Sequence, residues 1–438
     1  MSATSTTSAT STSAATSATA SVASLGIPPR LQHFLPGHAA ALKRIDAINP
    51  AQYARSRNAL DGAVTGLSPY LTHGMVGTAD VARAIHQRSP LSFDDKLVFE
   101  LGWREFFHHV WSRAPLGGDG ILNNMHGEPP WRGHYKDTLP LDIREGRTGV
   151  PVIDNAVRVL YATGYLHNHM RMWLASYTVH VRKVHWRAGA DWLYSHLLDG
   201  DLPSNHLSWQ WVAATFSSKP YLFNAENVRK YAPVAARAAW DSAGTVIDTS
   251  YEALDVLARE KGDAGPERGQ HDGVAEPALH HHVNDTFLRP FMPVAGVLHT
   301  CGAIDNITNK AVELIHPWAL SAGAADAPSP QRFRLGVLHA PAHGAWPWSA
   351  RRWQFVLPAM AAVTDAVWVG DLAALNLSGA ASVTAQACLF PGYRQALAAQ
   401  ASLHTEPRLL ANPAMACRSF SKFYERARRD VAQFSDLL

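Results

Sequence analysis

Between Leu31 and about Tyr231, apolar residues recur at spacings of three and four, which is typical of amphipathic helices. The segments with this pattern are 81–86, 96–112, 152–163, 169–184 and 190–198. Gly and Pro residues separate them, and few runs alternate as strands do. The pattern therefore predicts one all-helical domain.

After residue 331 the pattern changes. Residues 334–340 and 366–370 are short apolar runs typical of strands, and residues 349–363 have helical spacing. Strand, helix and strand in this order indicate a small α/β unit. It contains no GxGxxG turn, so a dinucleotide site of that kind is not expected. The predicted fold class is mainly α, a helical domain followed by a small α/β unit.

These patterns divide the chain into four parts. Residues 1–24 are almost entirely Ser, Thr and Ala, and we expect residues 1–26 to form a disordered tail. Residues 27–290 form the expected helical domain. Residues 291–331 are expected to be a linker, and residues 332–438 form the α/β unit, whose role the sequence does not indicate.

Composition excludes some classes of protein. No run of about 18 apolar residues is present, so we expect no membrane span. Three cysteines are too few for a disulfide framework or a four-thiolate cluster, which favours a reducing cytoplasm. Three consecutive histidines at 280–282 cannot converge on one ion from a regular element, and no metal site is predicted. A net charge of +3 neither requires nor opposes a nucleic-acid partner.

The stretch 199–211 carries the most chemistry, with two carboxylates, an amide and two tryptophans. Asp199 and Asp201 need partners if they are buried, because unpaired buried carboxylates are unfavourable. The arginines on the preceding helices, Arg158, Arg171 and Arg182, are candidates.

Three other clusters precede this stretch. In segment 167–172, Asn168 suits an N-cap. In segment 65–74, hydroxyls and backbone amides would suit a phosphate, although Ser-Pro also simply begins helices. On a helix, Glu100, Trp103 and Arg104 would share one face.

Taken together and in order, these segments resemble the FAD-binding domain of DNA photolyases and cryptochromes, from about Tyr53 to Tyr231. The motifs that carry the resemblance are Tyr53 with Arg57-Asn58, 67–71 (LSPYL), 103–106 (WREF), 148–154 (TGVPVID), 163–168 (TGYLHN), 199–201 (DGD) and 209–211 (WQW). The resemblance implies an all-helical domain that binds FAD and performs blue-light-driven electron transfer.

The resemblance also implies which residues hold FAD. They are Tyr53, Thr65, Gly66, Leu67, Ser68, Asn168, Arg171, Asp199, Asp201 and Asn205. Arg171 and Asp199 would form an ion pair stacked against the flavin, and Asn205 would face the flavin N5. Gly66 stands where the family usually has Arg or Lys, which removes one charged contact.

Electron transfer and lesion binding are assigned in the same way. Trp209 matches the electron donor nearest the flavin and Trp186 the second, while the third is Tyr135 or Trp131. The lesion-binding positions are Glu100, Trp103, Arg104, His169, Met172 and Trp211. The catalytic set is Glu100, Trp103, Trp186, Asn205, Trp209 and Trp211. At His169 many cyclobutane-dimer photolyases carry Arg, so one permanent charge is lost.

Three functions stay open at this point. The first is a DNA photolyase that splits pyrimidine dimers, with damaged DNA as its partner. The second is a cryptochrome-like photoreceptor that signals through flavin photoreduction, and the third is a non-catalytic FAD- or DNA-binding module. Photolyases usually place an α/β antenna domain before the FAD domain, whereas here the α/β-like segment follows it. Antenna motifs are not found there, and no antenna pigment is assigned.

Overall fold

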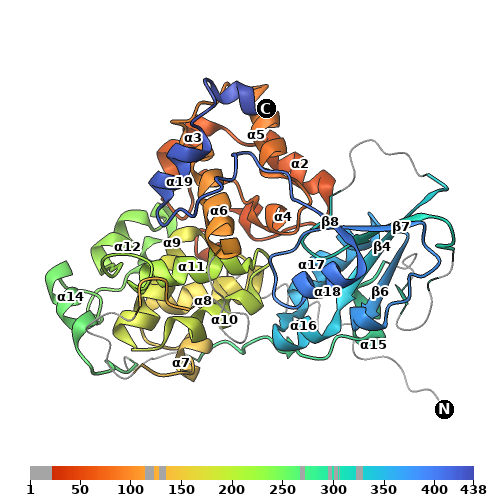
Figure 1. Cartoon of the computed structure of the whole chain (residues 1–438). Helices are drawn as coiled ribbons and strands as arrows, with labels where there is room; N and C mark the ends of the chain where they lie inside the picture. The colour runs from red at the N-terminus through yellow and green to blue at the C-terminus, as the bar shows by residue number, and fades with distance from the viewer. Residues whose placement is uncertain are drawn as a thin grey trace, which may run out of the picture.

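The computed structural model describes residues 22–113, 123–127, 135–266, 272–293, 298–299, 304, 306–321 and 329–438. Helices form one side of the molecule and a parallel sheet the other, as Figure 1 shows. Residues 1–21 of the predicted tail and Trp131 lie outside the described residues. The last part of that tail is ordered, contrary to prediction, because Val22 and Leu25 are buried and the Trp240 indole donates to the Leu25 carbonyl at 2.9 Å.

The helical part runs to α15. Its elements are η1 (Pro29–Leu31), α2 (His38–Asp46), α3 (Pro50–Ser56), α4 (Ser68–Thr72), α5 (Thr78–His86), α6 (Lys96–Arg113), α7 (Leu141–Arg144), α8 (Pro151–Thr163), α9 (Asn168–Ser176), η2 (Tyr177–Val181), α10 (Trp186–His196), α11 (Leu202–Val212), α12 (Ala225–Tyr231), η3 (Val234–Ala236), α13 (Arg237–Trp240), α14 (Tyr251–Arg259) and α15 (Asp285–Leu288).

Local sequence explains where the helices near the site begin and end. Pro151 occupies the first turn of α8, where its missing N–H costs nothing, and Gly164 ends the helix with a φ of 69°. Asp201 caps α11 by accepting from Ser204 N, and Pro203 lies in its first turn. The five segments with helical spacing are all helical in the structure, with α9 continuing as the π-helical turn η2.

The α/β unit contains a six-stranded parallel sheet. Its strands lie in the order β2 (Leu298–His299), β6 (Ala366–Gly370), β4 (Arg332–His339), β3 (Ala311–Ile315), β7 (Ser382–Gln386) and β8 (Ser402–His404). The chain first builds outward from β3 through β4 to β6 and then restarts on the other side with β7 and β8. The strand order therefore reverses between β3 and β7, which is the switch point of a doubly wound sheet.

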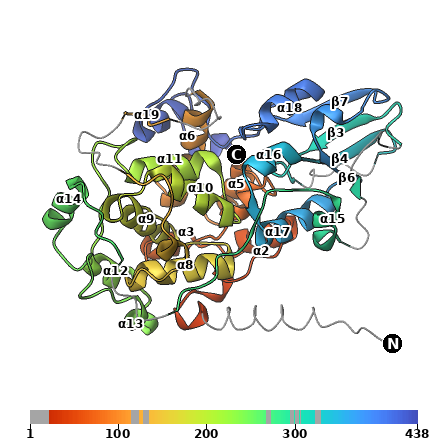
Figure 2. The same cartoon turned by 90° about the horizontal axis from the view of Figure 1, so that it is seen from below.

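The remaining elements cover the sheet or reach beyond it. They are η4 (Arg289–Phe291), α16 (Ala340–Ala345), β5 (Trp348–Ser349), α17 (Ala350–Ala361), η5 (Leu372–Ala374), α18 (Tyr393–Gln400), α19 (Phe420–Ala427) and η6 (Phe434–Leu437). Figure 2 shows α17 and α18 on opposite sides of the sheet. The short strand β1 (Leu279–His280) pairs antiparallel with β5 and joins the two parts.

The predicted boundaries of the α/β unit were wrong at both ends. Strand β3 lies inside the expected linker and is central in the sheet, with β4 and β7 on its two sides. Its five residues are too few to stand out by periodicity between loops. At the other end, α19 leaves the sheet and packs on α6 of the helical part, as Figure 1 shows.

The return of the C-terminal segment is held by hydrogen bonds to α6. The buried carboxylate of Glu105 accepts from Thr78 Oγ1 at 2.6 Å, from Leu409 N at 2.8 Å and from Leu410 N at 2.9 Å. His109, on the next turn, lies 2.7 Å from Asn412 Oδ1. One hydrophobic cluster includes residues from α4 to α6, the sheet and α19, whereas a second cluster is built mainly from α8 to α13 and includes Val22, Leu25 and Leu31 near the N-terminus. The helical part and the α/β unit therefore share a core.

Among the described residues, no helix has both the length and the apolar character that crossing a bilayer requires.

Replacement of Glu105 by Gln should weaken this attachment. The amide keeps the shape but offers one oxygen where three donors converge, so a buried donor loses its partner. We expect the free energy of unfolding to fall by about 1–3 kcal/mol, measured by urea denaturation. Glu425→Gln on the exposed face of α19 is the matched control and should change little. Equal stability of the two variants would contradict this account of the attachment.

Candidate functional site

The loop before α4 and the turn before α11 meet at the centre of the helical part. Ser68, the first residue of α4, donates its hydroxyl to Asp199 Oδ2. Thr72, at the end of the same helix, donates to the Asp199 carbonyl at 3.4 Å. The loop and the turn are more than 100 residues apart in sequence, and these hydrogen bonds join them.

Asp199 is an almost completely buried carboxylate with a partner on α9. Arg171 Nη2 donates to Asp199 Oδ2 at 2.7 Å, and Arg171 Nε donates to the Leu166 carbonyl. The other carboxylate oxygen, Asp199 Oδ1, is buried and has no hydrogen-bond partner among the described residues. Because a buried oxygen without a donor is unfavourable, this atom is suited to a donor from a ligand.

Asp201, two residues on, is paired with α6 instead. Asp201 Oδ2 lies 3.1 Å from His108 Nε2 and 3.3 Å from Arg104 Nη1, and it also accepts from Ser204. Burial opposes ionisation of this carboxyl, but His108, Arg104 and the Ser204 hydrogen bond outweigh burial and hold its pKa well below the usual range. Three arginines were candidate partners from the sequence. Arg171 pairs with Asp199, whereas Arg182 pairs with Asp142 and Asp263.

Two adjoining cavities lie against this turn, with volumes of about 270 Å³ and about 230 Å³. They share the lining residues Ser68, Glu100, Arg104, Arg171, Asp199 and Ser204. Their combined size falls in the range of about 300–1,000 Å³ that is usual for ligand pockets.

The larger cavity brings together most of the predicted site residues. Those that line it are Ser68, Glu100, Trp103, Arg104, Asn168, Arg171, Met172, Asp199, Asn205 and Trp209. The smaller cavity adds Tyr53, Thr65 and Asp201. Burial raises the pKa of Glu100, and the opposing effect of Arg57, 2.8 Å away, does not cancel it. The cavity therefore holds a carboxyl that keeps its proton more readily than an exposed one.

Six of the predicted residues line neither cavity, namely Gly66, Leu67, Tyr135, His169, Trp186 and Trp211. The ring of His169 stacks on Tyr231 at 4.5 Å, and this residue lines neither cavity. Trp211 is 37% exposed and contacts Tyr221, also outside both cavities. Trp186 is buried, and its indole donates to Asn124 Oδ1 at 2.6 Å.

Gly66 shows why a side chain is absent from the loop. Its φ is 61°, and a Cβ there would lie 2.7 Å from Arg44 Nη1. Arg44 comes from α2 and donates to the His33 carbonyl at 2.8 Å, with its guanidinium 4.3 Å from the Phe34 ring centre. A cation from another helix, Arg44 of α2, therefore lies beside the loop at Gly66.

Residues that the sequence did not reveal complete the walls. Phe107 and Ala175 line the larger cavity one turn or two from Glu100 and Met172, so helical spacing would have found them. Phe420 of α19 stacks on Trp103 with ring centres 4.2 Å apart and planes 9° apart. No local pattern signals this contact, because α19 is more than 300 residues from α6 in sequence.

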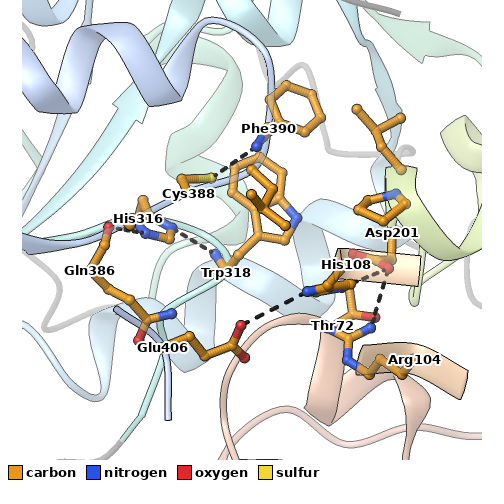
Figure 3. Close-up of a pocket in the computed structure, with 14 residues that line it drawn as sticks. Thr72, Arg104, His108, Asp201, His316, Trp318, Gln386, Cys388, Phe390 and Glu406 are labelled. Atoms are coloured by element: carbon orange, nitrogen blue, oxygen red, sulfur yellow. Dashed lines mark hydrogen bonds and ion pairs between the residues drawn. The ribbon is translucent and has the colours of Figure 1, made fainter. Parts of the chain in front are cut away.

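A third, small cavity lies on the other side of Asp201. Figure 3 shows Thr72, Arg104, His108 and Asp201 of the helical part facing residues of the α/β unit. The latter follow β3, β7 and β8, and include His316, Trp318, Cys388 and Glu406. Its volume of about 50 Å³ leaves room for a few waters at most. His108 Nδ1 lies 4.0 Å from Glu406 Oε2, so Asp201 is connected through His108 to the α/β unit.

Comparisons with known proteins match the same part of the chain. Residues 97–261 match the model of the FAD binding domain of DNA photolyase. The deoxyribodipyrimidine photo-lyase of a Synechococcus strain is 32% identical over 210 residues, which are 45% of this chain and 43% of the relative. That of Thermus thermophilus is 35% identical over 181 residues, 40% of this chain and 42% of the relative. Residues 97–261 of the helical part are therefore similar to the FAD-binding domain of the photolyase/cryptochrome family.

Structural comparison finds members of this family as well. A Synechocystis cryptochrome is 24% identical with a TM-score of 0.40, and the match covers 47% of this chain and 46% of the cryptochrome. A class III photolyase of Agrobacterium tumefaciens is 26% identical with the same TM-score, and the match covers 54% and 53%. The family assignment rests on the sequence matches. This chain spans less than half the length of the curated photolyases named above.

The cofactor of this family domain is FAD, and the residues present fit it. Asp199 lines both cavities, and its Oδ1, which has no hydrogen-bond partner among the described residues, would accept from a ring N–H. Arg171, paired with Asp199, would lie beside that ring, and Thr65 and Ser68, which carry hydroxyls, line the smaller cavity. Donors and acceptors are therefore present for both the flavin and a phosphate.

Replacement of Asp201 by Asn should measure what the buried charge contributes to stability. Asn also caps helices, so the cap of α11 is kept and only the charge is removed. The change leaves Arg104 and His108 without a carboxylate, so the free energy of unfolding at pH 7 should fall by about 3 kcal/mol. The native pKa of Asp201 lies below its unfolded value, so the ionised group stabilises the fold above the ordinary carboxyl range. The difference between wild type and variant should therefore shrink as the pH falls through about 4.

Denaturant unfolding at several pH values measures this effect. Asp255→Asn on α14, which breaks an exposed pair with Arg259, is the control and should cost less than about 0.5 kcal/mol. A difference for Asp201→Asn that stays constant with pH would show that the carboxylate charge is not what stabilises the turn.

Proposed function

We propose that this protein is a DNA photolyase that splits pyrimidine dimers. The observation that supports the proposal is the larger cavity. Glu100, Trp103 and Met172 line it together with Arg171, Asp199 and Asn205. When bound, FAD would supply light absorption and the electron that splits the dimer. Damaged DNA is the proposed partner.

The cavity-lining residues of α6 and α9 would bind the extruded dinucleotide. The Trp103 ring would stack on a base, because Phe420 covers one of its faces and leaves the ring fixed in orientation. Glu100, whose pKa is raised by burial, would donate a hydrogen bond to a base carbonyl. Flipping a dimer costs less than flipping a normal pair, because the lesion already weakens pairing and stacking.

The opposite wall would hold the flavin. Arg171 and Asp199 are proposed to lie against its ring, and Asn205 beside N5. In the present structure Asn205 Nδ2 donates to the Ala190 carbonyl at 2.8 Å, which leaves its amide oxygen as the group available to the cofactor. Tyr53, Thr65, Gly66, Leu67 and Ser68 are proposed for the phosphate end.

Trp209, in the cavity wall, is the proposed first electron donor during photoreduction. Its ring lies against Gly189 of α10, where any side chain would collide with it. Trp186 is proposed as the second donor, and Tyr135 or Trp131 as the outer one.

We further propose a division into a helical FAD-binding part and an α/β unit that starts at β2. The shared core supports a structural role for the α/β unit in addition to any other.

A repair assay tests the function directly. The photoreduced protein, incubated with a dimer-containing oligonucleotide, should restore the pyrimidines in blue light but not in the dark. Trp103→Ala should weaken dimer binding by about 5- to 150-fold, since stacking on one base contributes about 1–3 kcal/mol. Tyr251→Ala, an exposed aromatic on α14 outside the described cavities, should bind as wild type does. Absence of light-dependent repair by the FAD-loaded protein would refute the proposal.

A cryptochrome-like photoreceptor is the second candidate. The positions of His169 and Trp211 outside the cavity favour it, because a receptor needs no lesion contacts from them. Both candidates require flavin photoreduction, so photoreduction alone does not distinguish between them. Only the photolyase should repair dimers, and the repair assay therefore separates the two.

Photoreduction itself depends on the proposed donors. Trp209→Phe should abolish it, because phenylalanine is far harder to oxidise than tryptophan. The measurement is the loss of oxidised-flavin absorbance under blue light with an external reductant. Trp192→Phe is the matched control on α10, and it should be reduced at the wild-type rate, since Trp192 lines neither cavity. Unchanged photoreduction in Trp209→Phe would show that the electron takes another path.

A further inference from the structure

Arg352 of α17 is a completely buried arginine that reaches into the helical part. Its Nη2 donates to the Gly200 carbonyl at 2.6 Å, and its Nη1 to the Tyr194 carbonyl at 3.3 Å. Gly200 is the residue between Asp199 and Asp201. A side chain of the α/β unit therefore holds the backbone of the turn that carries both carboxylates.

The guanidinium is enclosed by aromatic rings. Its Cζ lies 4.0 Å from the Trp348 ring centre and 4.8 Å from that of Tyr194, and the Trp348 indole donates to the Tyr194 hydroxyl at 3.0 Å. Ring faces attract a cation, and more strongly where water is absent. The head group consequently has little freedom to move away from Gly200.

The packing also fixes the residue at position 200. A Cβ on Gly200 would lie 2.6 Å from the Tyr194 carbonyl oxygen and would collide with Arg352 Nη1. Only glycine fits between them. The turn and the arginine are thus matched in shape as well as in hydrogen bonding.

The charge of Arg352 is incompletely compensated. Among the described residues no carboxylate lies within ion-pair distance of it, and Arg352 Nε has no hydrogen-bond partner. Burial lowers the pKa of Arg352, while Tyr194, Asp199 and Asp201 oppose this effect. A buried cation is unfavourable unless nearby negative groups offset it. The two carboxylates that offset it belong to the cavity walls.

We propose that Arg352 is a positioning residue of the FAD site, which fixes the 199–201 turn and supplies a permanent positive charge beside its carboxylates. The proposal rests on FAD binding and not on DNA repair. It makes the α/β unit a necessary part of the cofactor site.

A second contact from the same side supports this role. His73 of the helical part lies between the Leu198 carbonyl, at 2.9 Å, and the Pro317 carbonyl of the α/β unit, at 2.6 Å. Burial lowers the pKa of His73 to about 3, so the ring is neutral and donates to one of the two. The His73 ring therefore lies between the backbone just before the turn and the α/β unit, with a hydrogen bond to one of the two.

The test compares Arg352→Met, Arg352→Lys and the control Arg351→Met in the full chain. Arg351 is the neighbouring, exposed residue of the same helix and lines neither FAD cavity. Apo-protein is titrated with FAD to give Kd, and the midpoint potential of bound FAD is measured by dye equilibration. Circular dichroism of each variant checks that it is folded.

We expect Arg352→Met to raise the Kd for FAD about tenfold or more, because the turn loses a charged donor. Its midpoint potential should shift to a more negative value, since a nearby cation favours the added electron. Arg352→Lys should restore the potential while recovering Kd only in part, because one ammonium cannot bond both carbonyls as a guanidinium does. A merely structural role would not separate these two quantities.

Wild-type Kd and potential in Arg352→Met would overturn the proposal. If Arg352→Met does not fold, the decision falls to Arg352→Lys, which must weaken FAD binding relative to Arg351→Met. A photolyase assay that fails while these shifts are observed would refute DNA repair and leave the role of Arg352 standing.

Discussion

The site depends on two carboxylates, Asp199 and Asp201, that are buried within three residues of each other. Each has its own arginine, Arg171 for Asp199 and Arg104 for Asp201, and Asp201 also lies 3.1 Å from His108. The separate partners matter because two buried like charges this close repel each other strongly. Three helices and α4 are oriented by these interactions, which explains why the cavities lie where α6, α9 and α11 meet.

Side chains of the α/β unit contact the 199–201 turn and the histidine that is paired with it. Arg352 holds the carbonyl between the two carboxylates, and Glu406 approaches His108 from the sheet side. The C-terminal segment then continues to α6 and presents Phe420 to Trp103. Contacts from the α/β unit and the C-terminal segment therefore reach both the flavin wall and the wall proposed for the lesion. A sheet with a doubly wound order usually presents a ligand crevice at its switch point. Here that crevice is almost filled by the helical part.

The proposed lesion-binding wall differs from the one that the resemblance implies. Glu100, Trp103 and Met172 line the cavity, whereas the ring of His169 is stacked on Tyr231 and Trp211 is at the surface. A neutral, stacked histidine supplies neither the charge nor the reach of an arginine at this position. The remaining wall is more apolar, and its affinity for DNA would depend on stacking more than on phosphate contacts.

The sequence by itself determined the helices, the β4–α17–β6 unit and most of the cavity residues. Helical spacing and capping are local, and the ordered motifs contain most of the residues that line the cavities. Only the tertiary structure decided which cation pairs with which carboxylate, since Arg171 and Arg182 are equivalent by spacing. It also decided the central place of β3, the partners of Glu105 and the roles of Arg352 and Phe420. These contacts join different elements, and those of Arg352 with Gly200, of Glu105 with Leu409 and of Phe420 with Trp103 span more than 100 positions, so no periodicity along the chain records them and packing selects them.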